Sequence, residues 1–295
     1  MPPIHNNPGS SAPQPRVVLY HQTHYRNSTE FVSALPLITE AASTIPITHL
    51  IIAAFHINED PNHITLNNDP PADPRHDRVW EEVKTLQDAG VTVLGMLGGA
   101  AKGSYRRLDR SEEEFATYYT PLRDVIRQHN LQGLDLDVEE TMSIEGIIRL
   151  IDCLKLDFGP SFIITLAPVA RALQGLPHLS GFDYQLLEAM RGDSIAWYNT
   201  QFYNNWGSLG TFADYDIILA AGWKLEKVVV GFLTHPGLGR GYVEWEELKR
   251  TVMVLAQFYR GFGGMMGWEY FCSMPGGEER PWEWAVEMGR CVGRN

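Results

Sequence analysis

Three acidic residues, Asp135, Asp137 and Glu139, occupy every second position of an apolar segment, 131–140. Successive side chains of a β-strand point to opposite faces, so a strand here places the three carboxyls on one face and the apolar residues between them on the other. Neighbouring members of this row are about 7 Å apart along a strand, so they do not all ionise readily in a poorly solvated interior. We therefore expect at least one of them to be protonated at neutral pH, which is the state that a general acid needs.

The acid row has two other interpretations, a metal site and a solvated strand face. A site for a hard metal ion would need further Asp, Glu or His side chains that converge from neighbouring strands, and the sequence does not place such a set. A solvated strand face is at odds with an all-parallel sheet, whose strands are buried on both faces. The spacing favours a catalytic carboxylate cluster, and we expect neither a metal site nor a cofactor.

The elements that must position this cluster follow from the pattern of apolar residues. Runs of strand length alternate with helical patterns along the chain, at 17–20, 50–55, 91–97, 131–138, 162–167, 195–203, 228–233 and 263–269. Helices are expected over about 77–89, in a segment that begins at the capping box of Ser111, and in another that ends near Gly159. Further helices are expected near 183–191, 213–221, 243–259 and 279–288. Eight strands that alternate with helices predict an α/β fold, a single (β/α)8 TIM barrel without a large insertion domain.

A doubly wound open sheet is the alternative fold. It would need a glycine-rich phosphate turn after an early strand, but the first strand is followed by His21-Gln22-Thr23-His24. We expect residues 1–15, which are rich in Pro, Ser and Asn, to form a disordered tail, and residues 16–295 to form the barrel. The long loop over 56–75 is expected on the catalytic face, where it would shape a substrate cleft.

Composition excludes several classes of protein and partner. The 295 residues carry a net charge of -12, which opposes binding to nucleic acid or to an anionic membrane surface. Apolar runs are well short of the ~20 residues that span a bilayer, and no secretory signal is seen, so the sequence as it stands predicts a cytoplasmic protein, with secretion left open. Cys153, Cys272 and Cys291 are expected to be free thiols.

The acid segment is similar to a signature of a known enzyme family. Gln132-Gly133-Leu134-Asp135-Leu136-Asp137-Val138-Glu139 resembles the fourth-strand motif DGxDxDxE of the family 18 glycoside hydrolases, the chitinases and endo-β-N-acetylglucosaminidases, with Gln132 in place of the first Asp. Other segments resemble this family in the same order. On strand three, Met96-Leu97-Gly98-Gly99 resembles the family motif SxGG, with Met96 in place of Ser. Thr165–Pro168 resembles the segment on strand five, Gln201–Asn204 resembles the motif on strand six, and Trp268 falls where the family has a Trp at the end of strand eight.

The resemblance implies a role for each matching residue. Glu139 would be the general acid and base, and Asp137 would orient the substrate acetamido group while it shares a proton with Asp135. Tyr203 would donate its hydroxyl to the acetamido oxygen. The family uses no protein nucleophile: the carbonyl oxygen of the substrate's own N-acetyl group attacks the anomeric carbon and forms an oxazolinium ion. The sugar at the cleaved bond must then be a 2-acetamido sugar.

Further residues are expected to bind the substrate. Trp268 would form the apolar floor under a sugar ring, because the CH-rich face of a pyranose packs on an indole. Gln132 and Met96 are expected to alter one support network behind the acids. The remaining expected contacts are Gln201, Asn204, Gly98, Gly99, Trp206 and Tyr270.

These observations lead to one expected function and two alternatives. The first is a retaining endo-glycosidase that hydrolyses β-1,4 linkages of N-acetylglucosamine, of chitinase type, on chitin or chitooligosaccharides. The second is an endo-β-N-acetylglucosaminidase that cleaves the di-N-acetylglucosamine core of N-glycans, and the third is a catalytically silent sugar-binding protein on the same barrel. The expected partner is an oligosaccharide or polysaccharide that contains N-acetylglucosamine, and the sequence does not indicate an oligomeric state.

Overall fold

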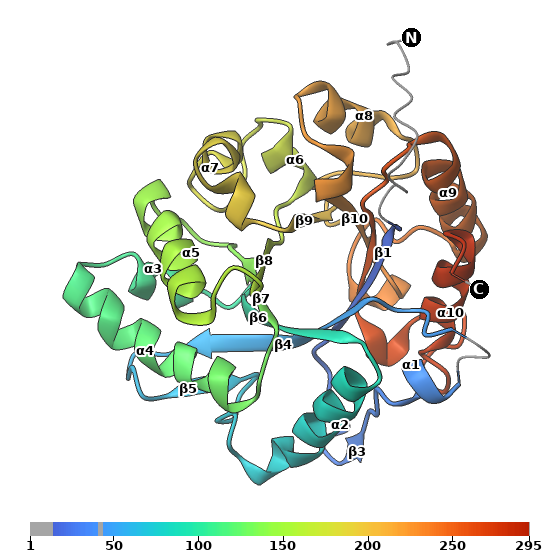
Figure 1. Cartoon of the computed structure of the whole chain (residues 1–295). Coiled ribbons are helices and arrows are strands. Elements are labelled where there is room, and N and C mark those ends of the chain that lie inside the picture. The colour runs from blue at the N-terminus through green and yellow to red at the C-terminus, as the bar shows by residue number, and fades with distance from the viewer. Residues whose placement is uncertain (1–13, 41–43, 295) are drawn as a thin grey trace.

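Eight parallel strands close into a barrel in the computed structural model, which describes residues 14–40 and 44–294 (Figure 1). Each barrel strand pairs with the next one along the chain, and the last strand pairs with the first, so the sheet has no open edge within the barrel. The predicted (β/α)8 barrel is confirmed. Its strands are β1 (Arg16–His21), β4 (His49–Ile57), β6 (Thr92–Gly98), β7 (Gly133–Asp137), β8 (Ile163–Leu166), β9 (Trp197–Gln201), β10 (Val228–Leu233) and β11 (Gly264–Trp268).

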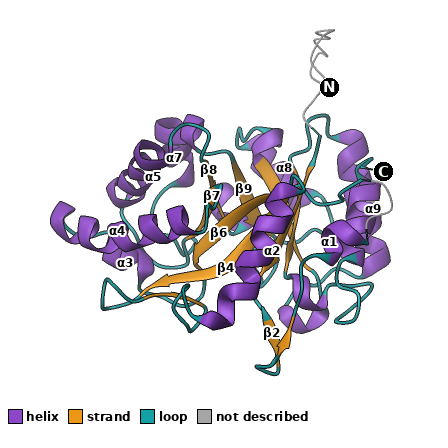
Figure 2. Ribbon diagram, turned by 60° about the horizontal axis from the view of Figure 1, so that its bottom comes forward, coloured by secondary structure: helices purple, strands orange, loops and turns teal. Residues whose placement is uncertain are grey.

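Helices form the outer layer around these strands (Figures 1 and 2). The larger ones are α2 (Asp77–Asp88), α4 (Glu112–Gln128), α5 (Ile144–Phe158), α7 (Tyr184–Arg191), α8 (Ala213–Ala220), α9 (Trp245–Phe258) and α10 (Glu283–Cys291). Short helices are α1 (Pro36–Thr39), α3 (Ser104–Leu108) and α6 (Ala170–Leu173). The predicted capping box is present, since the Ser111 hydroxyl accepts from the amide of Glu114.

The last helix begins later than the sequence pattern predicted. It starts at Glu283 rather than near residue 279, because Pro281 interrupts the pattern. Proline has no amide hydrogen to donate and disfavours the helical conformation of the residue before it, so the helix forms only after this position.

Two apolar layers hold the barrel together, one on each face of the sheet. Val17 and Leu19 of β1 point outward into the core between strands and helices, whereas Val18 and Tyr20 point into the barrel interior. This alternation is the period of two that a strand imposes on its side chains. Each buried aliphatic side chain contributes about 1.5–3 kcal/mol relative to an exposed one, so these two layers are the main source of stability.

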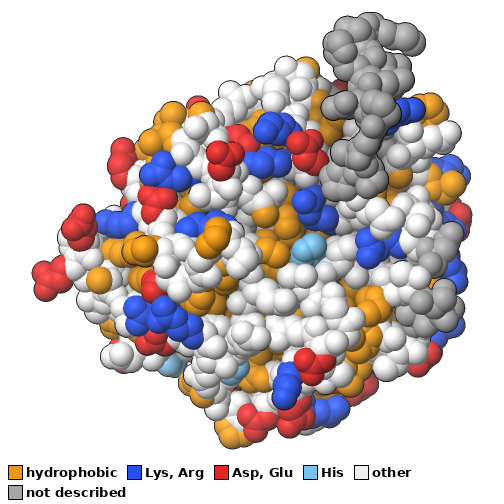
Figure 3. Space-filling model, in the orientation of Figure 1, with side chains coloured by type: hydrophobic (Ala, Val, Ile, Leu, Met, Phe, Trp, Pro, Cys, Tyr) orange, Lys and Arg blue, Asp and Glu red, His pale blue; other side chains and the backbone are white. Residues whose placement is uncertain are grey.

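Charged side chains of both signs are scattered over the outer surface (Figure 3), and their ion pairs are mostly exposed. Figure 3 shows positive and negative side chains interspersed around the rim of one face. Examples are Arg191 with Asp152, at 2.6 Å, and Arg127 with Asp157, at 2.7 Å. Exposed pairs contribute only about 0–1 kcal/mol each, so this surface adds little to stability.

The loops beyond the carboxyl ends of β1 and β4 contain small elements of their own. The loop over 56–75, expected on the catalytic face, carries β5 (Ile64–Leu66), which pairs antiparallel with the end of β4. After β1, a hairpin of β2 (Tyr25–Arg26) and β3 (Glu30–Phe31) projects from the end of the barrel (Figure 2). These two loops form one wall of the site described below.

Three other predictions bear on the chain as a whole. The expected tail, residues 1–15, lies outside the described residues except for its last two positions, and the assigned elements run from Arg16 to Cys291. The three cysteines are free, as predicted. Among the helices of the described ranges, none has the length and apolar character needed to cross a bilayer.

Candidate active site

The acid row of β7 points into the barrel, at the end where the strands finish. Asp135 and Asp137 lie on β7 beside Met96 and Gly98 of β6, and Glu139 follows two residues after the strand ends. Asp135 is fully buried and Asp137 nearly so, whereas Glu139 is half-buried. The three acids therefore lie at different depths, with Asp135 the deepest and Glu139 the nearest to solvent.

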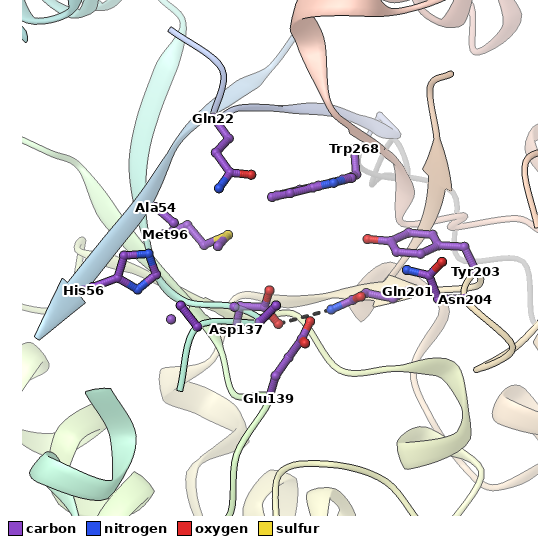
Figure 4. Close-up of a pocket in the computed structure, with 14 residues that line it drawn as sticks. Gln22, Ala54, His56, Met96, Asp137, Glu139, Gln201, Tyr203, Asn204 and Trp268 are labelled. Atoms are coloured by element: carbon purple, nitrogen blue, oxygen red, sulfur yellow. Dashed lines mark hydrogen bonds between the residues drawn. The ribbon is translucent and has the colours of Figure 1, made fainter. Parts of the chain in front are cut away.

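Asp137 and Glu139 line a cavity of about 360 Å³ (Figure 4). The ends of several strands contribute to it, as expected for the catalytic face of such a barrel. Its other lining residues are Gln22, Ala54, His56, Met96, Gly98, Gly99, Ala100, Ala101, Gln201, Tyr203, Asn204 and Trp268.

Asp135 lies beneath this cavity and does not line it. Its carboxylate accepts hydrogen bonds from the hydroxyls of Tyr20, at 2.8 Å, and Thr165, at 2.5 Å, and from the amide of Asn199, at 3.0 Å. Burial raises the pKa of Asp135, and these three donors oppose that effect because they stabilise the charged form. The structure thus gives Asp135 a supporting role under the site rather than contact with a ligand.

Asp137 and Glu139 form an interacting pair. Burial, and then the charge of Glu139, raise the pKa of Asp137 well above its ordinary value. Burial also raises the pKa of Glu139, while hydrogen bonding from Gln201 and the positive charge of Lys102 oppose that rise. The pair therefore favours retention of a proton, the condition for general acid catalysis.

The resemblance implies that Asp137 shares a proton with Asp135, and the charge of Asp135 also raises the pKa of Asp137. Within the described residues no hydrogen bond joins these two carboxyls, and Glu139 has a larger effect than Asp135 on the pKa of Asp137. Asp135 instead accepts from the hydroxyls of Tyr20 and Thr165 and from the side-chain amide of Asn199.

Two glycines let the end of β6 approach Asp137 closely. Gly98 has a φ of +96°, and a Cβ atom there would lie 2.5 Å from the backbone oxygen of Asp137. Gly99 donates its amide to that same oxygen over 2.9 Å. The Gly98-Gly99 pair, expected to contact substrate, lines the cavity and also secures the strand that carries the acids.

Trp268 and Tyr203 face the acids from the other side of the cavity (Figure 4). Trp268 ends β11, with its ring 5.4 Å from that of Tyr20, and presents an indole surface to the cavity. The Tyr203 side chain is buried, and its hydroxyl has no hydrogen-bond partner within the described ranges. Burial and the nearby acids raise the pKa of Tyr203 well above its ordinary value, so the hydroxyl keeps its proton and can donate it in a hydrogen bond.

Gln201 and Asn204 line the cavity but are largely engaged by the protein. The Nε2 atom of Gln201 donates to Asp137 Oδ1 over 3.1 Å and to the Ala167 carbonyl over 2.8 Å. Oδ1 of Asn204 accepts from the amide of Arg240 over 2.9 Å. Gln201 thus orients Asp137 and also lines the cavity, and the amino group of Asn204 makes no hydrogen bond in the described part of the chain.

Two residues expected to stack on sugars do not belong to this cavity. Tyr270 is fully buried, packs against His21 and donates its hydroxyl to the Ser33 carbonyl over 2.9 Å. It follows β11 by two residues, and there the chain turns into the apolar core. Trp206 is half-buried against the outer core and does not line the cavity.

The two departures from the family motifs lie far apart. Gln132 is exposed at the start of β7, where its Oε1 accepts from the Val93 amide over 2.8 Å and extends the pairing of β6 with β7. Met96 lines the cavity, beside Asp135. The expectation that both alter one support network is wrong, because Gln132 lies at the opposite end of the strand from the acids.

Several lining residues were not predicted as ligand contacts. Gln22 follows β1 directly, and Ala54 lies near the end of β4, so the rule that sites form at the carboxyl ends of barrel strands could have indicated them. Of the histidines near these ends, His56 lines the cavity, whereas His21 and His24 are buried beside it. Among the described residues, no three His, Cys, Asp or Glu side chains are grouped as a metal ion would require.

Comparisons with known proteins agree with this geometry. Residues 16–235 match the family model described as glycosyl hydrolases family 18. Chitinase 2 from Rhizopus oligosporus is 29% identical over 210 residues, which are 65% of this chain and 36% of that protein. The chain thus spans about a third of the length of this curated relative.

Two solved structures are similar over nearly their whole length. A fungal endo-β-N-acetylglucosaminidase from glycosyl hydrolase family 18 superimposes with a TM-score of 0.90 and 48% identity, over 95% of this chain and 98% of that one. A chitinase from Aspergillus fumigatus superimposes with a TM-score of 0.86 and 55% identity, over 94% of this chain and 99% of that one. The fold, the order of the motifs and the family match together establish that this chain belongs to family 18 of the glycosyl hydrolases.

Proposed function

We propose that the protein is a retaining endo-glycosidase of chitinase type that hydrolyses β-1,4 linkages of N-acetylglucosamine in chitin or chitooligosaccharides. The observation that carries this proposal is the interacting pair of Asp137 and Glu139 in a cavity faced by the indole of Trp268. An acid that keeps its proton, a second carboxyl beside it and an aromatic surface opposite suit a sugar ring held for cleavage.

In the first step, Glu139 donates its proton to the glycosidic oxygen as the bond from that oxygen to the anomeric carbon breaks. The carbonyl oxygen of the sugar's own acetamido group attacks the anomeric carbon, and the leaving sugar departs as an alcohol. Asp137 accepts a hydrogen bond from the acetamido N–H and stabilises the positive charge of the oxazolinium ion. Tyr203 donates to the acetamido oxygen and so holds the group in place for attack.

In the second step, the Glu139 carboxylate removes a proton from water as the water oxygen attacks the anomeric carbon. The bond from that carbon to the acetamido oxygen breaks, which restores the acetamido group and the protonated Glu139. Two successive displacements at one carbon give net retention of configuration.

A second candidate is an endo-β-N-acetylglucosaminidase that cuts the di-N-acetylglucosamine core of N-glycans. The 48% identity to a fungal enzyme of that name supports it. Both candidates need a 2-acetamido sugar over Trp268, and they differ in what is attached to it.

Mass spectrometry of the products tests these candidates. The wild-type protein, Glu139→Gln and the exposed-site control Glu113→Gln are each incubated with chitohexaose and, separately, with a high-mannose glycopeptide. Cleavage of chitohexaose supports the chitinase, whereas release of a glycan that ends in one N-acetylglucosamine supports the second candidate. We expect Glu139→Gln to lose at least ~10²-fold in rate while it still binds sugar.

Two results would count against the proposal. Equal rates for the wild type and Glu139→Gln would place the acid elsewhere. If the wild type cleaves neither substrate but binds chitohexaose, the protein is a silent sugar-binding protein, and the first variant to make is Met96→Ser, because Met96 lines the cavity.

A further inference from the structure

Gln22 lies where the catalytic cavity meets a second hollow. It lines both spaces, as do His56 and Ala101, and the second hollow has a volume of about 620 Å³. The walls of this hollow are mostly polar and come from the loops after β1 and β4. They include Thr23, His24, Tyr25, Asn67, Asp69 and Arg75.

The backbone of Gln22 is held from two sides. Its amide donates to Oε2 of Glu269 over 2.9 Å, and its carbonyl accepts from Nδ2 of Asn67 over 2.8 Å. The Glu269 carboxylate also accepts from the amide and the hydroxyl of Thr23, both over 2.8 Å. Glu269 is only 4% exposed, so a buried carboxylate fixes the loop to the end of β11.

Asn67 is anchored in turn. The backbone amide of Asn67 donates to the carbonyl of Ala54 over 2.8 Å, and the side-chain Oδ1 of Asn67 accepts from the backbone amide of Ala54 over 3.3 Å. The loop after β1, the loop after β4 and the end of β11 are therefore joined at Gln22 by hydrogen bonds to its main chain.

The side chain of Gln22 is not used in this arrangement. It makes no hydrogen bond to any residue in the described part of the chain, and Figure 4 shows it extending into the cavity near Trp268. An amide group offers both a donor and an acceptor, which together match sugar hydroxyls. Because its main chain is already fixed, such a group loses less conformational freedom when it binds a ligand.

We propose that Gln22 is a specificity-determining residue that hydrogen-bonds the sugar next to the one over Trp268, where an oligosaccharide passes from the cavity into the second hollow. Glu269 is its positioning residue. This inference rests on the proposed function, since it assumes that a chain containing N-acetylglucosamine occupies the cavity. It predicts that Gln22 distinguishes substrates by length.

The test compares Gln22→Ala with the wild type on chitooligosaccharides of two to six sugars. We expect kcat/KM to fall about tenfold on substrates long enough to reach the hollow, mainly through a higher KM, with a change of less than about twofold on the shortest substrate that is cleaved. Asn67→Ala and Glu269→Gln should show the same dependence on length. The matched control is Gln257→Ala, on the exposed side of α9, which should behave as the wild type at every length.

Calorimetric binding of the same oligosaccharides to Glu139→Gln, with and without Gln22→Ala, keeps this test separate from the proposed function. If the wild type cleaves nothing, binding still shows whether Gln22 discriminates by length. A loss that is the same at every length, or no loss at all in Gln22→Ala, overturns the inference. Circular dichroism of Asn67→Ala and Glu269→Gln shows whether each is folded, and Gln22→Ala decides the result if neither is.

Discussion

The hydroxyl of Tyr20, on β1, donates to the fully buried carboxylate of Asp135, on β7, over 2.8 Å across the barrel interior. Thr165 and Asn199 donate to the same carboxylate from β8 and β9. One side chain thus satisfies donors from three other strands. Asp137 and Glu139 lie beyond this hydrogen-bonded layer, toward the cavity that they line.

We expect Asp135→Ala to lower the free energy of unfolding by about 3 kcal/mol, because three buried donors would lose their acceptor. Urea denaturation at pH 7 measures this difference. Asp124→Ala, at an exposed position of α4, is the control and should change stability by no more than about 0.5 kcal/mol. Equal stability of the two variants would show that the layer under the acids is not needed for folding.

Tyr203→Phe should lower kcat by about 10²-fold, because in the proposed mechanism it removes the hydroxyl that donates to the acetamido oxygen. The Tyr203 ring would remain, so binding of chitooligosaccharides should change little. Initial rates and calorimetry separate the two effects. Tyr259→Phe, at the end of α9, removes a hydroxyl that donates to Asp216 of α8, and it should leave kcat unchanged. A Tyr203→Phe variant with wild-type kcat would exclude a role for the hydroxyl in the reaction.

The pH profile of kcat/KM should reflect the raised pKa of Glu139. Activity should persist above the pH at which an ordinary glutamic acid has lost its proton, and it should fall at higher pH as Glu139 ionises. The positive charge of Lys102 favours the ionised form of Glu139, so Lys102→Met should raise the pKa of Glu139 further and move the alkaline limb to higher pH.

Lys84→Met, on the exposed side of α2, is the matched control for Lys102→Met. Its alkaline limb should coincide with that of the wild type. A shift to lower pH in Lys102→Met would contradict the electrostatic assignment.

His21 should make the fold less stable in acid. Burial lowers the pKa of His21 to about 4 from an ordinary value of 6.5, so the unfolded chain binds a proton more readily than the folded one. This contribution to stability is present above pH 6.5 and is lost as the pH falls towards about 4. Over that interval the free energy of unfolding should decrease by roughly 3 kcal/mol on account of this residue, taking about 1.4 kcal/mol for each pH unit.

His21→Phe keeps a ring packed against Tyr270 but removes the group that takes up a proton. The free energy of unfolding of this variant should therefore decrease less between pH 7 and pH 4.5 than that of the wild type. Urea denaturation at the two values measures this. His63→Phe, at an exposed position, should retain the pH dependence of the wild type. The same pH dependence in both variants would show that His21 is not the group responsible.

Much of the fold could be predicted because the signals are local. Apolar runs, the capping box at Ser111 and the glycine at the end of α5 depend on neighbours a few residues away. The alternation of acidic and apolar residues on β7 likewise fixes which side chains share a face. The barrel and the acid row therefore followed from the sequence.

The partners of the acids could not be predicted in the same way. Tyr20, Thr165 and Asn199 are far from Asp135 in the chain, and they meet it only because the barrel closes with a particular register. Trp268 and Tyr270 differ by two positions, yet one lines the cavity and the other is buried, because the chain leaves the strand between them.

The sequence by itself determined the (β/α)8 fold, the row of Asp135, Asp137 and Glu139, and the family resemblance. Only the tertiary structure decided that Tyr20, Thr165 and Asn199 hold Asp135 and that Gln22 is held at the mouth of a second hollow. The physical reason is that these effects act over different separations along the chain. Strand periodicity acts between adjacent residues, whereas burial, charge and hydrogen bonding depend on which distant segments the closed barrel brings together.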